Sequence, residues 1–205
     1  MTTRNSMTIM TRTKWALSGL ALASLVACSG GGSGSTTTPP PAKTIADRLD
    51  YTNPSGGTYT LMKNTTLSTS THLVLDLMGP VGTQGTGVGF YLSADTTKLT
   101  WSKPAGSESI LARNGVFDLG TAPQLATAKT SGDQLQVGFY QKGTTKPAVT
   151  FTATSVLASV ALDLKSNVSV GAGGNLTAIA GKAVLTQGSG APVNITITPG
   201  IVTAN

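Results

Sequence analysis

The sequence predicts an all-β fold, a single antiparallel β-sandwich. Thr, Val, Gly and Ser dominate the chain beyond residue 43, and helical periodicity is scarce. Instead, short runs of alternating apolar residues recur between clusters of Gly, Pro, Asn and Asp. Roughly nine short strands at this spacing favour two packed sheets over one open sheet.

Three runs carry the clearest alternation, namely Thr71–Met78, Val88–Ser93 and Leu135–Tyr140. Because successive side chains of a strand point to opposite faces, each run has one apolar face and one face of mainly polar residues or glycine. This parity places Tyr91 and Tyr140 on outer faces. Further half-buried strands are expected at Tyr59–Met62, Leu99–Trp101, Ala148–Phe151, Val160–Leu164, Gly181–Leu185 and Val193–Val202.

Residues 1–27 have the layout of a signal peptide. Arg4, Arg12 and Lys14 make the start basic, and a mostly apolar stretch of 13 residues follows, Trp15–Ala27. A membrane-spanning helix needs about 20 apolar residues, so this stretch is too short to cross a bilayer. The pattern indicates a cleaved export signal.

The signal ends in Leu25, Val26, Ala27 and Cys28. These residues resemble the lipobox of bacterial lipoproteins, which implies that Cys28 is lipidated and becomes the mature amino terminus. Several acyl chains together give stable anchoring. By the same resemblance, Ser29 in place of Asp implies the outer membrane of a two-membrane bacterial envelope. The alternative is an ordinary secretory signal in which Cys28 is incidental.

Residues 28–43 form a linker rich in Gly, Ser, Thr and Pro, which includes Cys28 and holds the folded part away from the membrane. The remaining residues, 44–205, are long enough for one domain with a substantial core. We therefore expect a signal peptide over 1–27, an acylated cysteine and linker over 28–43, and a β-sandwich domain over 44–205.

Composition argues against several functions. The net charge is +6, but it falls to +3 without the three basic residues of the export signal, and the remainder forms no basic stripe for nucleic acid. One cysteine and one histidine cannot build a Cys/His zinc cluster or an internal disulfide. We expect no metal, no cofactor and no nucleic-acid partner.

Four segments occur in a characteristic order, which is Gly87–Lys103, Gln134–Tyr140, Val156–Lys165 and Thr198–Ala204. Their pattern of strands and turns resembles that of cohesin domains, with matching positions at Asp95, Leu99, Leu157, Ala158, Val160 and Leu162. The resemblance implies a jelly-roll β-sandwich that binds a dockerin. Carbohydrate-binding modules have closely related sandwiches, so fold does not choose between protein and polysaccharide.

The tetrapeptide VGFY occurs twice, at Val88–Tyr91 and Val137–Tyr140. The cohesin resemblance implies that these strands are neighbours in the sheet that binds a partner. Tyr91 and Tyr140 would then lie beside Gly89 and Gly138, where missing side chains leave the rings accessible. Such tyrosines suit protein interfaces and sugar stacking alike. Trp101 is either a further sugar-stacking surface or a core residue at a strand end.

Signs of catalysis are weak. His72 and Asp76 share a strand face but lie about 13 Å apart, too far for a hydrogen-bonded pair. Glu108 has no partner carboxylate nearby in sequence, and no Gly-x-Ser-x-Gly elbow occurs. We therefore expect a lipid-anchored, noncatalytic protein-interaction module. The alternatives are a carbohydrate-binding module and a structural envelope lipoprotein.

Overall fold

The computed structural model describes residues 42–120, 125–141, 146–188 and 191–205. These residues belong to one compact unit, and all of its regular secondary structure is β-strand. None of the described segments is a helix of sufficient length and apolarity to cross a membrane. The export signal, Cys28 and nearly all of the linker lie outside the described residues.

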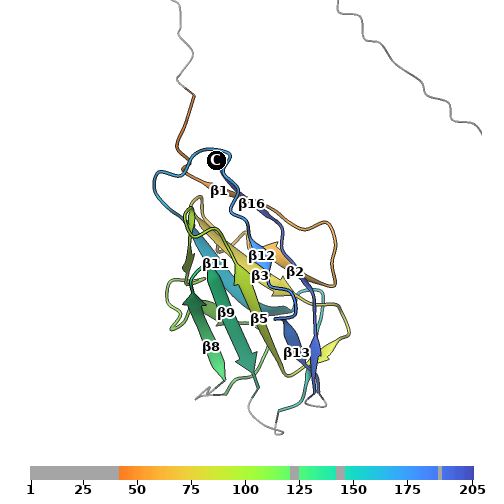
Figure 1. Cartoon of the computed structure of the whole chain (residues 1–205). Coiled ribbons are helices and arrows are strands. Elements are labelled where there is room, and N and C mark those ends of the chain that lie inside the picture. Colours follow the sequence, from red (N-terminus) through yellow and green to blue (C-terminus); the bar gives the residue numbers. More distant parts are fainter. Residues whose placement is uncertain (1–41, 121–124, 142–145, 189–190) are drawn as a thin grey trace, which may run out of the picture. The chain divides into compact units, whose positions relative to one another are not determined.

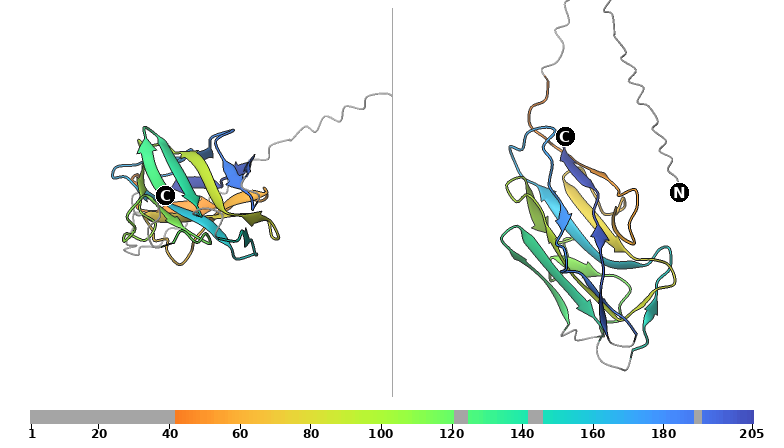
Figure 2. Two further views of the ribbon diagram at one scale, coloured as in Figure 1. Left: turned by 90° about the horizontal axis from the view of Figure 1, so that it is seen from below. Right: turned by 45° about the vertical axis from the view of Figure 1, so that its right-hand side comes forward.

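Two six-stranded sheets pack face to face (Figures 1 and 2). The first sheet has the order β15 (Ile197–Thr198), β2 (Tyr59–Lys63), β3 (His72–Met78), β11 (Val156–Leu164) and β6 (Leu99–Ser102), with β7 (Ala112–Asn114) also beside β11. The second has the order β14 (Pro192–Asn194), β13 (Val184–Thr186), β5 (Gly87–Ser93), β9 (Gln134–Tyr140) and β8 (Ala126–Ser131), with β12 (Thr177–Ala178) also beside β5.

Two short ribbons complete the sandwich. They pair β1 (Leu49–Thr52) with β16 (Ile201–Ala204), and β4 (Gln84–Gly85) with β10 (Val149–Thr150). The all-β sandwich is confirmed, but its pairing is not purely antiparallel, because β15 runs parallel to β2.

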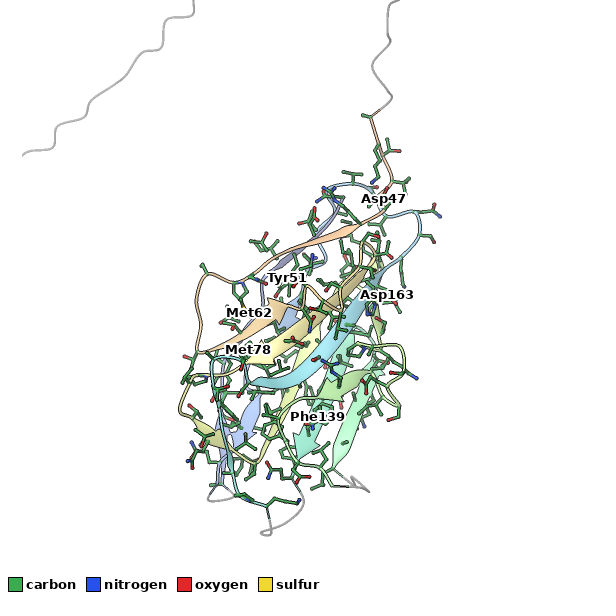
Figure 3. The ribbon with its side chains drawn as sticks, turned by 180° about the vertical axis from the view of Figure 1, so that it is seen from behind. Asp47, Tyr51, Met62, Met78, Phe139 and Asp163 are labelled. Carbon is green, nitrogen blue, oxygen red and sulfur yellow. The ribbon has the colours of Figure 1, made fainter. Side chains whose placement is uncertain are left out.

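The core lies between the sheets and follows the predicted alternation. Leu75, Phe90 and Leu135 are fully buried, as are their same-face neighbours on each strand. Phe139 on β9 is 2% exposed and is labelled in Figure 3, which views the domain from the side of the first sheet. Burial of large apolar side chains from both inner faces is the main force that holds the two sheets together.

Several strand boundaries differ from the sequence prediction. The expected strand Val193–Val202 is three strands, β14, β15 and β16, each in a different sheet or ribbon. Pro199 has no N–H to donate to a sheet, which interrupts the pairing before β16. At the expected strand Gly181–Leu185, Gly181 has a positive φ of 69°, and pairing begins only at Val184.

The outer faces of the two sheets are unequal. On the first sheet, the outward residues Val74 and Asp76 are both buried. The segment that precedes β3 bonds to this face, since Asn64 Nδ2 donates to Asp76 Oδ2 at 2.8 Å and Ser68 Oγ accepts from Val74 N at 2.9 Å. On the second sheet, Tyr91 and Tyr140 are only partly buried and Lys129 is exposed. The open face is therefore that of the second sheet.

Candidate functional site

The two VGFY strands are neighbours, as the sequence predicts. Strands β5 and β9 pair antiparallel with Gly89 opposite Gly138 and Tyr91 opposite Gln136. Since Phe90 and Val137 point into the core, Tyr91 and Tyr140 point outward. We call the outward side chains of β8, β9, β5 and β13, together with Lys182 just before β13, the tyrosine face.

Tyr140 lies across a floor of glycines. A β-carbon on Gly89 would be 2.2 Å from Tyr140 Oη, and one on Gly138 would be 3.3 Å from Tyr140 Cε2. The ring therefore lies flat over these residues instead of standing free, which corrects the expectation that the glycines leave it fully accessible. Glycine is required here because any side chain would occupy the space of the ring.

The two tyrosines belong to one local environment. Burial raises the pKa of the Tyr140 phenol, and the neighbouring Tyr91 raises it further. A higher pKa keeps the Tyr140 hydroxyl protonated at neutral pH, so it can donate a hydrogen bond. Tyrosines of this kind combine an apolar ring with a polar edge, a combination that is frequent at protein interfaces.

A groove of about 330 Å³ runs along the tyrosine face. Its floor is Gly89 and Gly138, and its walls include Thr127, Lys129, Gln136 and Lys182 as well as both tyrosines. Lys129 was not singled out in the sequence, because strand β8 carries only small or polar residues and lacks the apolar alternation that marks the other strands.

Trp101 is not part of this surface. It is 6% exposed, and its indole N–H donates to the backbone oxygen of Asp133 at 3.1 Å. The ring thus packs in the core near the end of β6, which is the second of the two alternatives that the sequence left open. As a sugar-stacking surface Trp101 is excluded, because stacking needs an exposed ring face.

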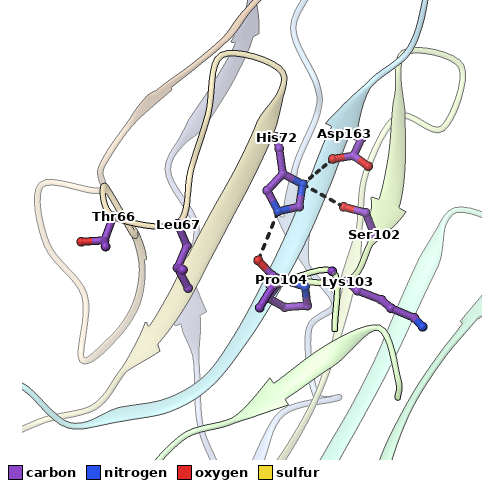
Figure 4. A pocket seen from close by; sticks show the side chains of 9 residues that line it. Thr66, Leu67, His72, Ser102, Lys103, Pro104 and Asp163 are labelled. Atoms are coloured by element: carbon purple, nitrogen blue, oxygen red, sulfur yellow. Dashed lines mark hydrogen bonds and ion pairs between the residues drawn. The ribbon is translucent and has the colours of Figure 1, made fainter. Parts of the chain in front are cut away.

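A second pocket, of about 570 Å³, lies on the outer side of the first sheet (Figure 4). His72 Nδ1 is 2.5 Å from Asp163 Oδ1, and His72 Nε2 is 3.2 Å from the backbone oxygen of Pro104. Sequence analysis missed Asp163 because it is 91 residues from His72 and comes beside it only through the pairing of β3 with β11. No local pattern in the sequence signals this contact.

The second pocket does not have the geometry of a serine hydrolase. In such enzymes the serine and the carboxylate bond to opposite nitrogens of the histidine. Here Ser102 Oγ is 3.5 Å from Nδ1, the nitrogen that already contacts Asp163, and the carbonyl of Pro104 occupies the other. His72 therefore connects β3, β11 and the loop after β6. Across the described part of the chain, no group of three His, Cys, Asp or Glu side chains could hold a metal ion.

No protein-family model and no curated protein sequence matches this chain. Solved structures do match. A type II cohesin (A11) from Bacteroides cellulosolvens is 16% identical, with a TM-score of 0.51 over 71% of this chain and 98% of the cohesin. The sixth cohesin of scaffoldin B from Acetivibrio cellulolyticus, solved with a mutant Cel5 dockerin, is 14% identical, with a TM-score of 0.50 over 71% and 97%.

A type II cohesin domain from the cellulosome of Acetivibrio cellulolyticus is 8% identical to this chain, with a TM-score of 0.50 over 72% of the chain and 94% of the cohesin. Each match spans nearly a whole cohesin and the greater part of this chain. At such low identity the likeness concerns the fold. The domain is a cohesin-like β-sandwich.

Proposed function

We propose that this chain is a noncatalytic protein-interaction module that binds its partner through the tyrosine face. The observation that carries the proposal is the arrangement of Tyr91 and Tyr140 above the Gly89–Gly138 floor on the one open sheet face. The outer side of the other sheet is covered by its own loops. A rigid aromatic surface on a sheet costs little conformational entropy when it binds.

A dockerin-like protein is the partner class that we propose. One of the similar cohesins was solved with a dockerin, which supports this choice by fold likeness. The residues of the tyrosine face support protein binding independently, because partly buried tyrosines beside glutamine and threonine offer both apolar contact and hydrogen bonds.

The proposal is tested by recovery of native ligands with residues 41–205, the compact unit that contains every described strand and the whole core. Wild type is expected to retain a protein that Tyr91→Ala and Tyr140→Ala release. Val81→Ala is the control, since Val81 is 70% exposed and away from the tyrosine face. Retention that ignores both tyrosine changes would contradict the proposal.

A carbohydrate-binding module is the second candidate, because tyrosine rings also stack on sugars. With Trp101 in the core, only Tyr91 and Tyr140 remain of the stacking residues that the sequence suggested. Retention of the domain by a polysaccharide, abolished by the same tyrosine changes, would favour this function. If neither ligand class is retained, a structural envelope lipoprotein remains.

We also propose that the module is anchored by acyl chains on Cys28 in the bacterial envelope, in the outer membrane. The support is the sequence Leu25–Cys28 after a basic and apolar signal. Cys28→Ser is expected to release the protein from membranes and to abolish incorporation of labelled palmitate. A processed protein whose Cys28 sulfur is unmodified by mass spectrometry would overturn the anchoring without touching the binding proposal.

A further inference from the structure

We propose that the partner inserts an acidic side chain between Lys129 and Lys182 on the tyrosine face. This inference rests on the proposed function and specifies the chemistry of the partner at that site. It would give this face a preference for partners with Asp or Glu at the contact surface.

Both lysines stand on one row across the sheet. Lys129 on β8 pairs with Gln136 on β9, and Gln136 pairs with Tyr91 on β5. On the far side of Tyr91 lies Lys182, because Ile179 N donates to Tyr91 O at 3.0 Å and Val184 pairs with Gly89. The row is therefore Lys129–Gln136–Tyr91–Lys182. At about 4.8 Å per strand its ends are roughly 14 Å apart, and two flexible lysine stems can span this distance toward one anion.

The next row supplies the space. It runs from Thr127 through Gly138 and Gly89 to Val184. Its two glycines form the floor of the groove, with Tyr140 lying over them. A partner backbone can approach closely at such a hollow. The hollow lies beside the lysine row, so an inserted side chain meets Tyr91, Gln136 and both ammonium groups.

The charge of the face is of one sign. No acidic side chain points outward from the described strands β5, β8, β9 and β13. The nearest carboxylate, that of Asp133 in the β8–β9 turn, accepts a hydrogen bond from Ser93 at the end of the face. Among the described residues, Lys98 and Lys146 have carboxylate partners, whereas Lys129 and Lys182 have none. A carboxylate from a partner would meet this positive charge and find donors in Gln136 and Tyr140.

The test selects ligands from random sequences, so the natural partner need not be identified first. A random dodecapeptide library is panned on residues 41–205 of the wild type, on Lys129→Gln/Lys182→Gln, and on a control, Lys63→Gln/Lys103→Gln. The control removes the same charge from lysines outside the groove. Peptides that depend on Tyr140 are expected to be enriched in Asp and Glu for wild type and control only. Loss of both groove lysines should weaken such peptides by about two- to thirtyfold at low salt, and less at high salt.

Each other outcome is decisive. Peptides that depend on Tyr140 but show no acidic enrichment would overturn this inference and leave the proposed function standing. Absence of any peptide that depends on Tyr140, together with retention of wild type by polygalacturonate, would overturn both, because the anionic ligand would then be a sugar polymer. Equal weakening by the control pair would show that overall charge, and not the groove, attracts the acidic peptides.

Discussion

The hydroxyl oxygen of Tyr140 lies above Gly89 of the neighbouring strand, so close that a β-carbon on residue 89 would be 2.2 Å from it. The glycine of one VGFY strand thus sets the position of the tyrosine of the other. Because the contact involves the far end of a side chain, the ring can swing away if the space is filled. The shape of the groove depends on this one missing side chain.

We predict that Gly89→Ala leaves the fold intact but displaces the Tyr140 ring. The backbone of Gly89 has no positive φ, so alanine adds little backbone strain, and any change in stability should be within about 1 kcal/mol. Partner retention should fall as it does for Tyr140→Ala. Gly56→Ala is the control, since a β-carbon there meets nothing within 4 Å. Full retention by the Gly89 variant would disprove the coupling between these residues.

A buried polar contact should matter for stability on the first sheet. Ser159 is fully buried, and its Oγ donates to Asp76 Oδ1 at 2.6 Å. Ser159→Ala removes one donor from a buried carboxylate, which should cost about 1–3 kcal/mol in urea unfolding. The Asp76→Asn/Ser159→Ala double variant should cost less than the sum of the single changes. Strict additivity would show that the two side chains act independently.

Tyr51 should make stability fall at alkaline pH. Its hydroxyl donates to the backbone oxygen of Leu61 at 2.8 Å and accepts from the N–H of Gly200 at 2.6 Å. Burial raises the pKa of Tyr51 to about 12, whereas a tyrosine in the unfolded chain ionises near pH 10. The stabilisation that this difference supplies is complete below about pH 10 and is lost as the pH rises through 12.

Tyr51→Phe should therefore be less stable than wild type at pH 8, and the gap should narrow between pH 10 and 12. Urea unfolding at pH 8, 10 and 11 measures this. Part of the alkaline slope should persist in the variant, because burial also raises the pKa of Tyr59 and Tyr140. An unchanged gap across this pH range would refute the role assigned to Tyr51.

His72 should restrain the loop after β6 through its contact with the backbone oxygen of Pro104. We predict that His72→Ala speeds hydrogen exchange of the amides of Ala105 and Gly106 several-fold while global stability falls by about 1 kcal/mol. Lys103→Ala is the matched control, since Lys103 lines the same pocket but is not the side chain that holds Pro104. Unchanged exchange in the His72 variant would show that the loop is held by other contacts.

Sequence alone predicts the strands with large alternating side chains. In β3, β5 and β9 one face carries Leu, Val or Phe at every second position, and this pattern survives in the fold. Strand β8 escapes notice because Ala126–Ser131 lies at a sheet edge and buries little. The short strands near the C-terminus are unclear in sequence because each pairs with a different distant segment.

The candidate site is predictable only to the same extent. Parity places Tyr91 and Tyr140 outward, and the paired VGFY sequences indicate neighbouring strands. The register that sets Tyr140 over Gly89 and aligns Lys129 with Gln136 is a long-range property. The contact between His72 and Asp163 is of the same kind. Local pattern carries no information about such pairs, since they arise from strand pairing and packing.

The most direct test of the binding surface is site-specific photocrosslinking in cells that make the full chain. A photoreactive residue replaces Gln136, in the centre of the tyrosine face, or Thr100, which is exposed on the outer side of the first sheet. We predict a protein adduct at position 136, none at position 100, and loss of the adduct when Tyr91→Ala and Tyr140→Ala are combined. A protein adduct at position 100 with none at position 136 would contradict the assignment of the tyrosine face.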